Sequence, residues 1–350
     1  MRGQISLFDG KNPLKIDKPI RLIELFAGIG SQAKALEKLG VDFEHYRMCE
    51  FDEDAVKSYN AVHGTEFEAT DIRQLTADDL GIVDTDKYTY ILTYSFPCQD
   101  LSKAGTLKGM AKGTRSGLLW EVERLLKECK ELPQILVMEN VSEVAGARNI
   151  ADFIKWQACL ERLGYRNVYD SHINARDYGM PQNRQRCFMV SYLGDYYYEF
   201  PRKTGLRMKA SDLFDDERIP LGENRQEREL ILSNVDGVAH IKQATKKGFI
   251  ELHDGGVVIL SFPQSPSRRG RVQGGGNVCP TIRAGAMQTF KYIDGEFYQL
   301  SPREAWRFMG FSDEDFDKAK ASGVSNQQLI KQAGNSIVVD CLEAIFKEMI

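Results

Sequence analysis

A cysteine that follows a proline is the residue of this sequence best placed to act as a nucleophile. Residues 88–95 are rich in aromatic and β-branched side chains, which predicts a buried strand that Pro97 ends. Cys98 therefore stands at the carboxyl end of a strand, the edge at which open α/β sheets bind their ligands. A thiolate there could attack an electron-poor substrate. Taken alone, such a cysteine is more often a buried structural residue.

Two further sets of polar residues lie at the ends of predicted strands. Residues 134–138 predict a strand that ends in Glu139, one crossover from Cys98, so both side chains would share one crevice. An acid beside a thiolate suits attack on a ring that is protonated as it reacts. Arg184 and Arg186 begin a later strand. Alternate residues of an extended chain point to one side, where they could orient a phosphate or a ring carbonyl.

The first strand and the turn after it predict a site for an adenosine-like ligand. Residues 20–26 form the strand, and the turn opens a helix whose first backbone amides face the ligand edge. Glu50 ends the next strand, where a carboxylate could accept the ribose hydroxyls. Phe26 and Phe51 could pack on an adenine face, and Asp71 could accept a hydrogen bond from the adenine amino group.

The composition is that of an ordinary globular protein without bulk affinity for nucleic acid. The chain has 350 residues, of which 27% are charged and 42% hydrophobic, and its net charge is -4. No apolar run approaches the roughly 20 residues that cross a bilayer, and the N-terminus lacks the pattern of a signal peptide, so we expect a cytoplasmic protein. Seven scattered cysteines without a C-x-x-C pair and five histidines without ligand spacing predict neither disulfides nor a metal.

Strands and helices alternate from residue 20 to about residue 192, which predicts an α/β fold with a doubly wound, mostly parallel sheet. After that point, short apolar pieces are mixed with charged and glycine-bearing stretches, which suggests a smaller, irregular lobe. We therefore expect a loosely held arm at 1–18, a catalytic and cofactor-binding domain at 19–194, the smaller lobe at 195–285, and a C-terminal return to the first domain at 286–350.

These motifs, in this order, resemble the DNA (cytosine-5)-methyltransferase family, particularly its small bacterial and mollicute members of the restriction–modification or orphan type. The resemblance leaves out only residues 1–18 and about 195–270. The matching segments are Phe26-Ala-Gly-Ile-Gly30, Glu50, Pro97-Cys98-Gln99, Glu139-Asn140-Val141, Gln182-x-Arg184-x-Arg186, Arg271 with Pro280-Thr281, and Gly334-Asn335-Ser336. So many motifs in one order are very hard to produce by chance.

The resemblance implies a fold of the S-adenosylmethionine-dependent methyltransferase type and a covalent mechanism. Cys98 would add to carbon 6 of a flipped-out cytosine, which makes carbon 5 nucleophilic enough to take a methyl group. Glu139 would donate a proton toward ring N3, so we expect its pKa to be raised. Arg184 would hold the ring carbonyl, and Arg186 would brace the site.

The resemblance also implies S-adenosylmethionine as methyl donor and double-stranded DNA as partner. The donor would contact Phe26, Ala27, Gly28, Ile29, Gly30, Glu50, Phe51, Asp71, Ile72, Pro97, Asn335 and Ser336. The DNA would contact Gln99, Ser102, Lys103 and Lys108 in a glycine-bearing loop, and Arg268, Arg269 and Arg271 in the smaller lobe, which would then recognise the target. We expect a monomer, and any cognate restriction endonuclease would act on the same DNA site without direct contact.

Three other functions compete with this interpretation. The same chemistry could act on transfer RNA. A non-catalytic DNA-binding homologue would be expected to lose Cys98 or Glu139, and both are present. A zinc deaminase also acts on cytosine, but it needs Pro-Cys-x-x-Cys, whereas Gln99, Asp100 and Leu101 follow Cys98 here. The sequence does not predict which DNA sequence is recognised.

Overall fold

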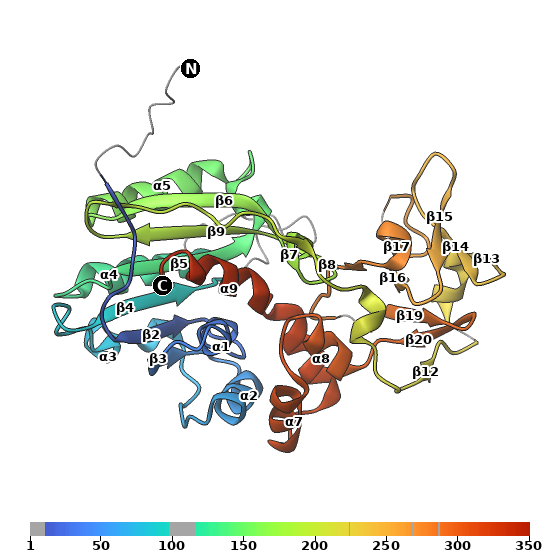
Figure 1. The fold of residues 1–350 in the computed structure, drawn as a ribbon, viewed down its shortest axis with the longest axis horizontal. Helices are drawn as coiled ribbons and strands as arrows, with labels where there is room; N and C mark the ends of the chain where they lie inside the picture. The colour runs from blue at the N-terminus through green and yellow to red at the C-terminus, as the bar shows by residue number, and fades with distance from the viewer. Residues whose placement is uncertain (1–10, 98–115, 224, 268, 286–287) are drawn as a thin grey trace, which may run out of the picture.

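The computed structural model describes residues 11–97, 116–223, 225–267, 269–285 and 288–350, which form a larger sheet lobe and a smaller strand-rich lobe (Figure 1). The larger lobe contains β2 (Ile20–Leu25), α1 (Ser31–Lys38), β3 (Phe43–Cys49), α2 (Glu53–His63), α3 (Ala77–Leu80), β4 (Thr89–Tyr94), α4 (Leu119–Glu128), β5 (Ile135–Val141), α5 (Ile150–Arg162), β6 (Arg166–Asn174) and β9 (Gln185–Tyr192). Strands and helices alternate through most of this lobe, as the sequence predicts.

Six of these strands form one sheet in the order β3-β2-β4-β5-β9-β6. The pairs from β3 to β5 are parallel, and β9 runs antiparallel to both of its neighbours, β5 and β6. The predicted α/β fold with a mostly parallel sheet is confirmed. The ends of β2, β4 and β5 meet at one edge, because Leu25 is in register with Tyr94 and Tyr94 with Met138.

Side chains on the two faces of the sheet fill two separate hydrophobic cores. Leu22 and Ile91 pack with α1 and with α9 (Val339–Lys347), whereas their neighbours Ile23 and Leu92 pack with α4 and α5. Successive residues of a strand point to opposite faces, so strands covered on both faces are apolar throughout. The near-continuous apolar run of β4 follows from this arrangement.

The smaller lobe has its own core and two antiparallel sheets. Its strands are β12 (Ile219–Pro220), β13 (Ile231–Val235), β14 (Val238–Lys242), β15 (Phe249–His253), β16 (Val257–Ile259), β17 (Arg271–Val272), β19 (Thr289–Ile293) and β20 (Glu296–Gln299). The five-stranded sheet has the order β12-β20-β19-β16-β17, and the other is β13-β14-β15. Phe290 and Phe297 pack in the same core as Leu221. Packing therefore extends this lobe beyond the expected boundary at residue 285.

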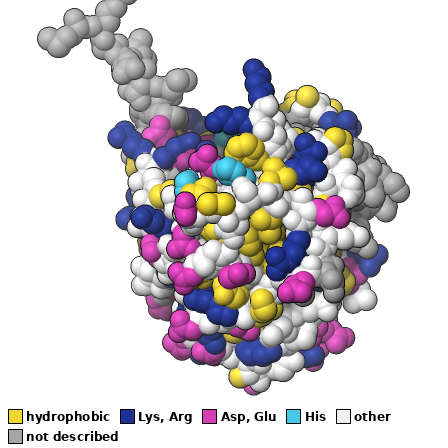
Figure 2. Space-filling model, turned by 90° about the vertical axis from the view of Figure 1, so that its right-hand side faces the viewer, with side chains coloured by type: hydrophobic (Ala, Val, Ile, Leu, Met, Phe, Trp, Pro, Cys, Tyr) yellow, Lys and Arg dark blue, Asp and Glu magenta, His cyan; other side chains and the backbone are white. Residues whose placement is uncertain are grey.

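The described side chains at the outer end of the smaller lobe form no uniform basic surface (Figure 2). Figure 2 shows basic, acidic and hydrophobic side chains intermixed on this face. A DNA-binding surface built on net charge alone would show one continuous patch of Lys and Arg. The described side chains of the face in Figure 2 therefore do not form a DNA-binding surface by charge alone.

Short strand pairs and the C-terminal helices join the two lobes. The pairs are β7 (Tyr178–Gly179) with β11 (Gly205–Leu206), and β8 (Gln182–Asn183) with β18 (Cys279–Pro280). The helices α6 (Pro302–Arg307), α7 (Asp313–Ala321) and α8 (Asn326–Asn335) lie near this junction, and α9 returns to the larger lobe (Figure 1). No helix among the described residues has the length and apolar character needed to span a membrane.

The described part of the N-terminal arm is held more firmly than its polar composition predicts. β1 (Asn12–Pro13) pairs with β10 (Tyr196–Tyr197), and the amide of Leu14 donates to the carbonyl of Tyr197 at 2.7 Å. The amide of Ile16 donates to the carbonyl of Met349 at 2.8 Å, and the Leu14 side chain is buried. Leu14 and Ile16, two apolar residues in a polar segment, thus attach this part of the arm to β10 and to the C-terminus.

Candidate active site

A strained turn links β2 to α1 at the ligand edge of the sheet. Phe26, Gly28 and Gly30 all have positive φ, at 59°, 56° and 78°. A side chain on Gly30 would collide with its surroundings, because a Cβ there would lie 2.2 Å from Nε2 of His63. A non-glycine residue such as Phe26 in this conformation costs on the order of 1 kcal/mol, and such strain is concentrated at functional sites.

Glu50 is tied to this turn by its carboxylate. Oε2 accepts from the amide of Gly28 at 3.0 Å, and Oε1 accepts from the amides of Phe51 and Asp52 at 2.9 and 3.0 Å. Burial raises the pKa of Glu50, and the three amides offset part of that rise. A carboxylate has about four acceptor positions. One position on Oε2 is therefore left for a ligand hydroxyl, rather than the two that the sequence suggested.

The predicted adenine contacts differ in whether the protein itself already binds their side chains. Phe51 is 74% exposed beside Glu50, which suits a ring that packs on a ligand. The carboxylate of Asp71 accepts hydrogen bonds from the side chain and the amide of Arg73, whose side chain lowers the pKa of Asp71. Asp71 is thus occupied within the protein. The neighbouring Ile72 is buried.

The end of α8 lies against the start of α1 on the same edge. The amide of Ile337 donates to Oγ of Ser31 at 3.3 Å. Asn335 is exposed, whereas Ser336 is buried and its hydroxyl donates to the carbonyl of Ala333 at 3.0 Å. Of these two predicted donor contacts, Asn335 has the exposed side chain, and Ser336 stabilises the end of the helix.

Glu139 and Arg186 form a pair at the carboxyl end of β5. Nε of Arg186 lies 3.0 Å from Oε1 of Glu139, and both side chains are largely buried. Burial raises the pKa of Glu139, while the charges of Arg186 and Arg184 lower it. The net effect is a raised pKa, as expected for a group that donates a proton.

Arg184 donates hydrogen bonds to three backbone carbonyls. Its Nη1 donates to the carbonyl of Ile282 at 2.8 Å, and its Nη2 donates to the carbonyls of Gly334 and Ser336 at 3.0 and 2.7 Å. The side chain is buried. These contacts fasten the end of the smaller lobe and the end of α8 to the sheet lobe. They fit a bracing role, whereas the sequence assigned bracing to Arg186.

Two hydrogen bonds fix Phe96 and Pro97, the two residues that precede the predicted nucleophile. The side-chain amide of Asn140 donates to the carbonyl of Phe96 at 2.8 Å, and Oγ of Ser116 donates to the carbonyl of Pro97 at 2.7 Å. The Asn140 contact ties Phe96, the residue before Pro97, to β5 one residue after Glu139. Six predicted site residues lie outside the described residues: Cys98, Gln99, Ser102, Lys103, Lys108 and Arg268.

Sequence reasoning missed the positioning roles of Asn140 and Ser116. Asn140 stands in the matched Glu139-Asn140-Val141 motif, so the motif itself could have indicated a role for its amide. Ser116 had no such signal, because its partner Pro97 lies 19 residues earlier in the sequence. Arg269 and Arg271 are described and lie in or beside β17 in the smaller lobe.

The fold also brings together Glu37, His45 and His63, whose sequence spacing gave no sign of a cluster. Their potential ligand atoms lie within 4.8 Å of one another. Nδ1 of His63 lies 2.6 Å from Oε1 of Glu37, and its Nε2 lies 3.2 Å from the carbonyl of Ile29 in the strained turn. Both ring nitrogens of His63 therefore already contact oxygen atoms. Burial, followed by the charge of His63, lowers the pKa of His45 to about 4.

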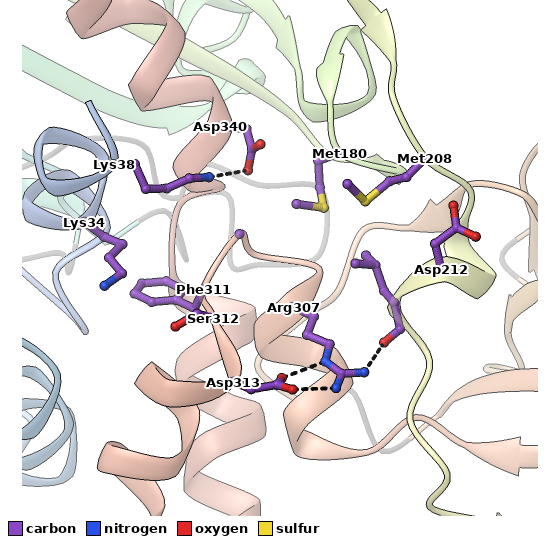
Figure 3. A pocket seen from close by; sticks show the side chains of 12 residues that line it. Lys34, Lys38, Met180, Met208, Asp212, Arg307, Phe311, Ser312, Asp313 and Asp340 are labelled. Atoms are coloured by element: carbon purple, nitrogen blue, oxygen red, sulfur yellow. Dashed lines mark hydrogen bonds and ion pairs between the residues drawn. The ribbon is translucent and has the colours of Figure 1, made fainter. Parts of the chain in front are cut away.

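A cavity of about 550 Å³ lies away from this edge, between α1, the segment after α6, and α9 (Figure 3). Its cations are already paired: Lys38 lies 3.7 Å from Asp340, and Arg307 lies 2.7 Å from Asp313. None of the predicted site residues lines it. The candidate active site is therefore the sheet edge and not this cavity.

Comparisons with known proteins agree on one family. A family model described as C-5 cytosine-specific DNA methylase matches residues 20–350. The type II methyltransferase M2.ScrFI of Lactococcus lactis subsp. cremoris is 34% identical, covering 94% of this chain and 99% of its own length. The orphan methyltransferase M.SssI of Spiroplasma monobiae is 30% identical, covering 95% and 97%.

Solved structures agree on the fold. The S. pombe Dnmt2 methyltransferase has a TM-score of 0.63 at 18% identity and covers 93% of this chain and 97% of its own. The Entamoeba histolytica methyltransferase EhMeth has a TM-score of 0.66 at 15% identity and covers 95% and 98%. The match to the family model covers nearly the whole chain and includes every motif found at the sheet edge. The chain belongs to the C-5 cytosine-specific DNA methylase family, and it is a DNA (cytosine-5)-methyltransferase.

Proposed function

We propose that this methyltransferase works through a covalent adduct of Cys98 with a cytosine flipped out of a short, specific DNA sequence. The Cys98 thiolate adds to carbon 6 of the ring, and the electron density gained at carbon 5 lets that carbon take the methyl group. Removal of the carbon 5 proton then expels the thiolate. Flipping the base costs a few kcal/mol, because the base cannot reach such an edge within the duplex.

The Glu139–Arg186 pair is the observation that carries this proposal. The raised pKa of Glu139 suits a group that protonates ring N3 as the thiolate adds. Arg186, 3.0 Å from Glu139, is the arginine better placed to reach the ring carbonyl. Arg184 supports the site through its three carbonyl contacts.

S-adenosylmethionine fits the other half of this edge and would supply the electrophilic methyl group when bound. The strained turn at Phe26, the remaining acceptor position on Glu50 and the exposed ring of Phe51 support this choice of donor. Asn335 adds an exposed amide side chain at the end of α8. Asp71 and Ser336 are better assigned to holding the local backbone.

The chain is further proposed to act as a monomer in the bacterial cytoplasm. It would share its DNA site with any cognate restriction endonuclease without touching that enzyme. Size-exclusion chromatography with light scattering tests the monomer, for which the expected mass is 39.7 kDa.

The experiment that tests the function is methylation of a plasmid by the purified protein with S-adenosylmethionine, followed by bisulfite sequencing. Protected cytosines within one short sequence are the expected result. Cys98→Ser should abolish protection while calorimetry still shows donor binding, because the nucleophile and not the donor site is removed. Full protection with Cys98→Ser would exclude the covalent mechanism, and no protection by the unaltered protein would exclude the DNA activity.

A further inference from the structure

Three arginines of the smaller lobe have no carboxylate partner in the described part of the chain. Among the described residues, no carboxylate oxygen lies within 4.0 Å of a side-chain nitrogen of Arg269, Arg271 or Arg283. The Nε atom of Arg269 is buried without a hydrogen-bond partner there. Elsewhere in the same lobe, Arg225 pairs with Glu227 at 2.7 Å. Arg218 and Arg228 also lack a carboxylate partner among the described residues, but their guanidinium groups donate to backbone carbonyls.

Arg283 projects from a backbone that is fixed on several sides. The hydroxyl of Thr281 donates to the carbonyl of Asn183 at 2.6 Å, and the carbonyl of Ile282 accepts from Arg184. Gly334 packs so closely that a Cβ on it would lie 2.2 Å from the carbonyl carbon of Arg283. A side chain on so rigid a base is pre-organised for a ligand.

The surroundings of the Arg283 guanidinium suit an anion that the protein itself does not provide. Its Cζ lies 5.7 Å from the ring centroid of Phe262, and the side chain is half-buried. Burial, followed by the charge of Arg271, lowers the pKa of Arg283. Two nearby cations are unfavourable together unless an anion lies between them.

Phe262 adds a second sign of function at this position. Its φ is 52°, an uncommon conformation for a bulky residue, and 45% of it is exposed. Strained backbone is found where function requires a fixed side-chain position. The aromatic ring lies over the guanidinium of Arg283 and supports it from one side.

We propose that Arg283 and Arg271 bind a backbone phosphate of the DNA, with the ring of Phe262 supporting the Arg283 guanidinium. This proposal deepens the DNA contact of the proposed function and rests on it. A base edge is reached by a side chain that enters a groove, whereas Arg283 is half-buried on a backbone tied to the sheet lobe. A phosphate needs only a pre-organised cation at the surface, and arginine forms two parallel hydrogen bonds to it.

The test measures how DNA binding depends on salt. Binding of a short fluorescein-labelled duplex to the full chain is followed by anisotropy across a series of NaCl concentrations. Arg283→Gln should weaken binding roughly tenfold, equally for duplexes of different sequence. It should also reduce the slope of log K against log salt by about 0.9, the value for one phosphate. Arg283→Lys should keep most of the slope, because it retains the charge.

Arg218→Gln is the matched control. The guanidinium of Arg218 also lies over an aromatic ring, 5.5 Å from the centroid of Tyr298. It precedes β12, at the opposite edge of the five-stranded sheet from β17, which carries Arg271. This variant should bind the duplex with unchanged affinity and slope.

Two results for Arg283→Gln would contradict the phosphate contact. An unchanged slope for Arg283→Gln overturns the proposal, and so does a changed target sequence at constant slope, which would mean that Arg283 reads a base. If Arg283→Gln does not fold by circular dichroism, Arg271→Gln at an exposed position must show the loss of slope instead. Bisulfite sequencing of plasmid treated with the unaltered protein is run in parallel, so that failure of the DNA activity is distinguished from failure of this contact.

Discussion

Two arginines that stand two residues apart have different surroundings, because the chain between them is not a continuous strand. Alternation along an extended chain predicted that Arg184 and Arg186 would point to the same side. Arg184, however, lies in the gap between β8 and β9, whereas Arg186 lies within β9 opposite Val141. The register places Arg186 beside Glu139, and Arg184 reaches the carbonyls near the C-terminus. The motif identified both residues but not their roles.

Replacing Arg186 tests whether Glu139 acts as an acid. The charge of Arg186 lowers the pKa of Glu139, so Arg186→Gln should raise that pKa further. Catalysis that needs protonated Glu139 is present below its pKa and lost as the pH rises through it. The alkaline fall in kcat should therefore move to higher pH in Arg186→Gln, with a lower plateau because the ring carbonyl loses its partner.

The measurement is methyl transfer at saturating donor and DNA over a range of pH. Arg166→Gln is the control, because Arg166 pairs with the exposed Asp195 at the far end of β6 and should leave the profile unchanged. An alkaline limb that stays in place in Arg186→Gln would mean that Glu139 does not supply the proton.

At the scale of elements, the sequence predicted which strand ends converge. It did not predict which side chains at that edge already form hydrogen bonds within the protein. Strand ends follow from local patterns, so the edge that carries Glu50, Pro97 and Glu139 was predictable. The occupation of Asp71 by Arg73 was not, because a motif gives a residue's type and not its partners. The strands predicted at 20–26, 88–95 and 134–138 correspond to β2, β4 and β5, whereas α8 was not predicted and its position against the smaller lobe depends on contacts between distant segments.

Gly334 is the position where this close approach can be tested. Alanine favours a helix over glycine by about 1 kcal/mol, so Gly334→Ala would stabilise α8 in isolation. A Cβ there would lie 2.2 Å from both the amide of Ala284 and the carbonyl carbon of Arg283, and backbone cannot move aside easily. Overpacking of this kind costs about 1–3 kcal/mol. We expect a lower Tm together with weaker DNA binding.

Thermal unfolding and duplex anisotropy of Gly334→Ala provide the check. Gly222→Ala is the control, since a Cβ there would lie 3.6 Å from Cγ of Arg225, an ordinary contact. If Gly334→Ala matched the unaltered protein in both Tm and DNA affinity, the segment of residues 281–284 would not be fixed by α8.

At the scale of the whole molecule, a buried charged group fastens the smaller lobe to the C-terminal helices. Nζ of Lys291 in β19 lies 2.5 Å from Oε1 of Glu304 in α6 and 3.3 Å from Oδ1 of Asp215. Lys291 and Glu304 are fully buried, and the hydroxyl of Ser301 donates to Asp215 at 2.6 Å. The lobe boundary expected at residue 285 separated Lys291 from the lobe, because sequence patterns do not reveal such long-range packing.

Lys291→Met should destabilise the protein strongly and in a pH-dependent way. Burial already raises the pKa of Glu304 to about 7, and Lys291 opposes that rise. Without Lys291 the pKa of Glu304 rises further. At low pH the folded variant keeps Glu304 neutral, whereas at high pH it must either bury an unpaired Glu304 carboxylate or unfold. Removing one partner of a buried pair costs about 3–5 kcal/mol. The loss of Tm relative to the unaltered protein should therefore grow as the pH rises from about 6 to about 8.

Lys87→Met, which removes an exposed pair with Asp84, should change Tm little at either pH. An equal Tm for Lys291→Met and the unaltered protein at the higher pH would mean that this buried group does not hold the two lobes together.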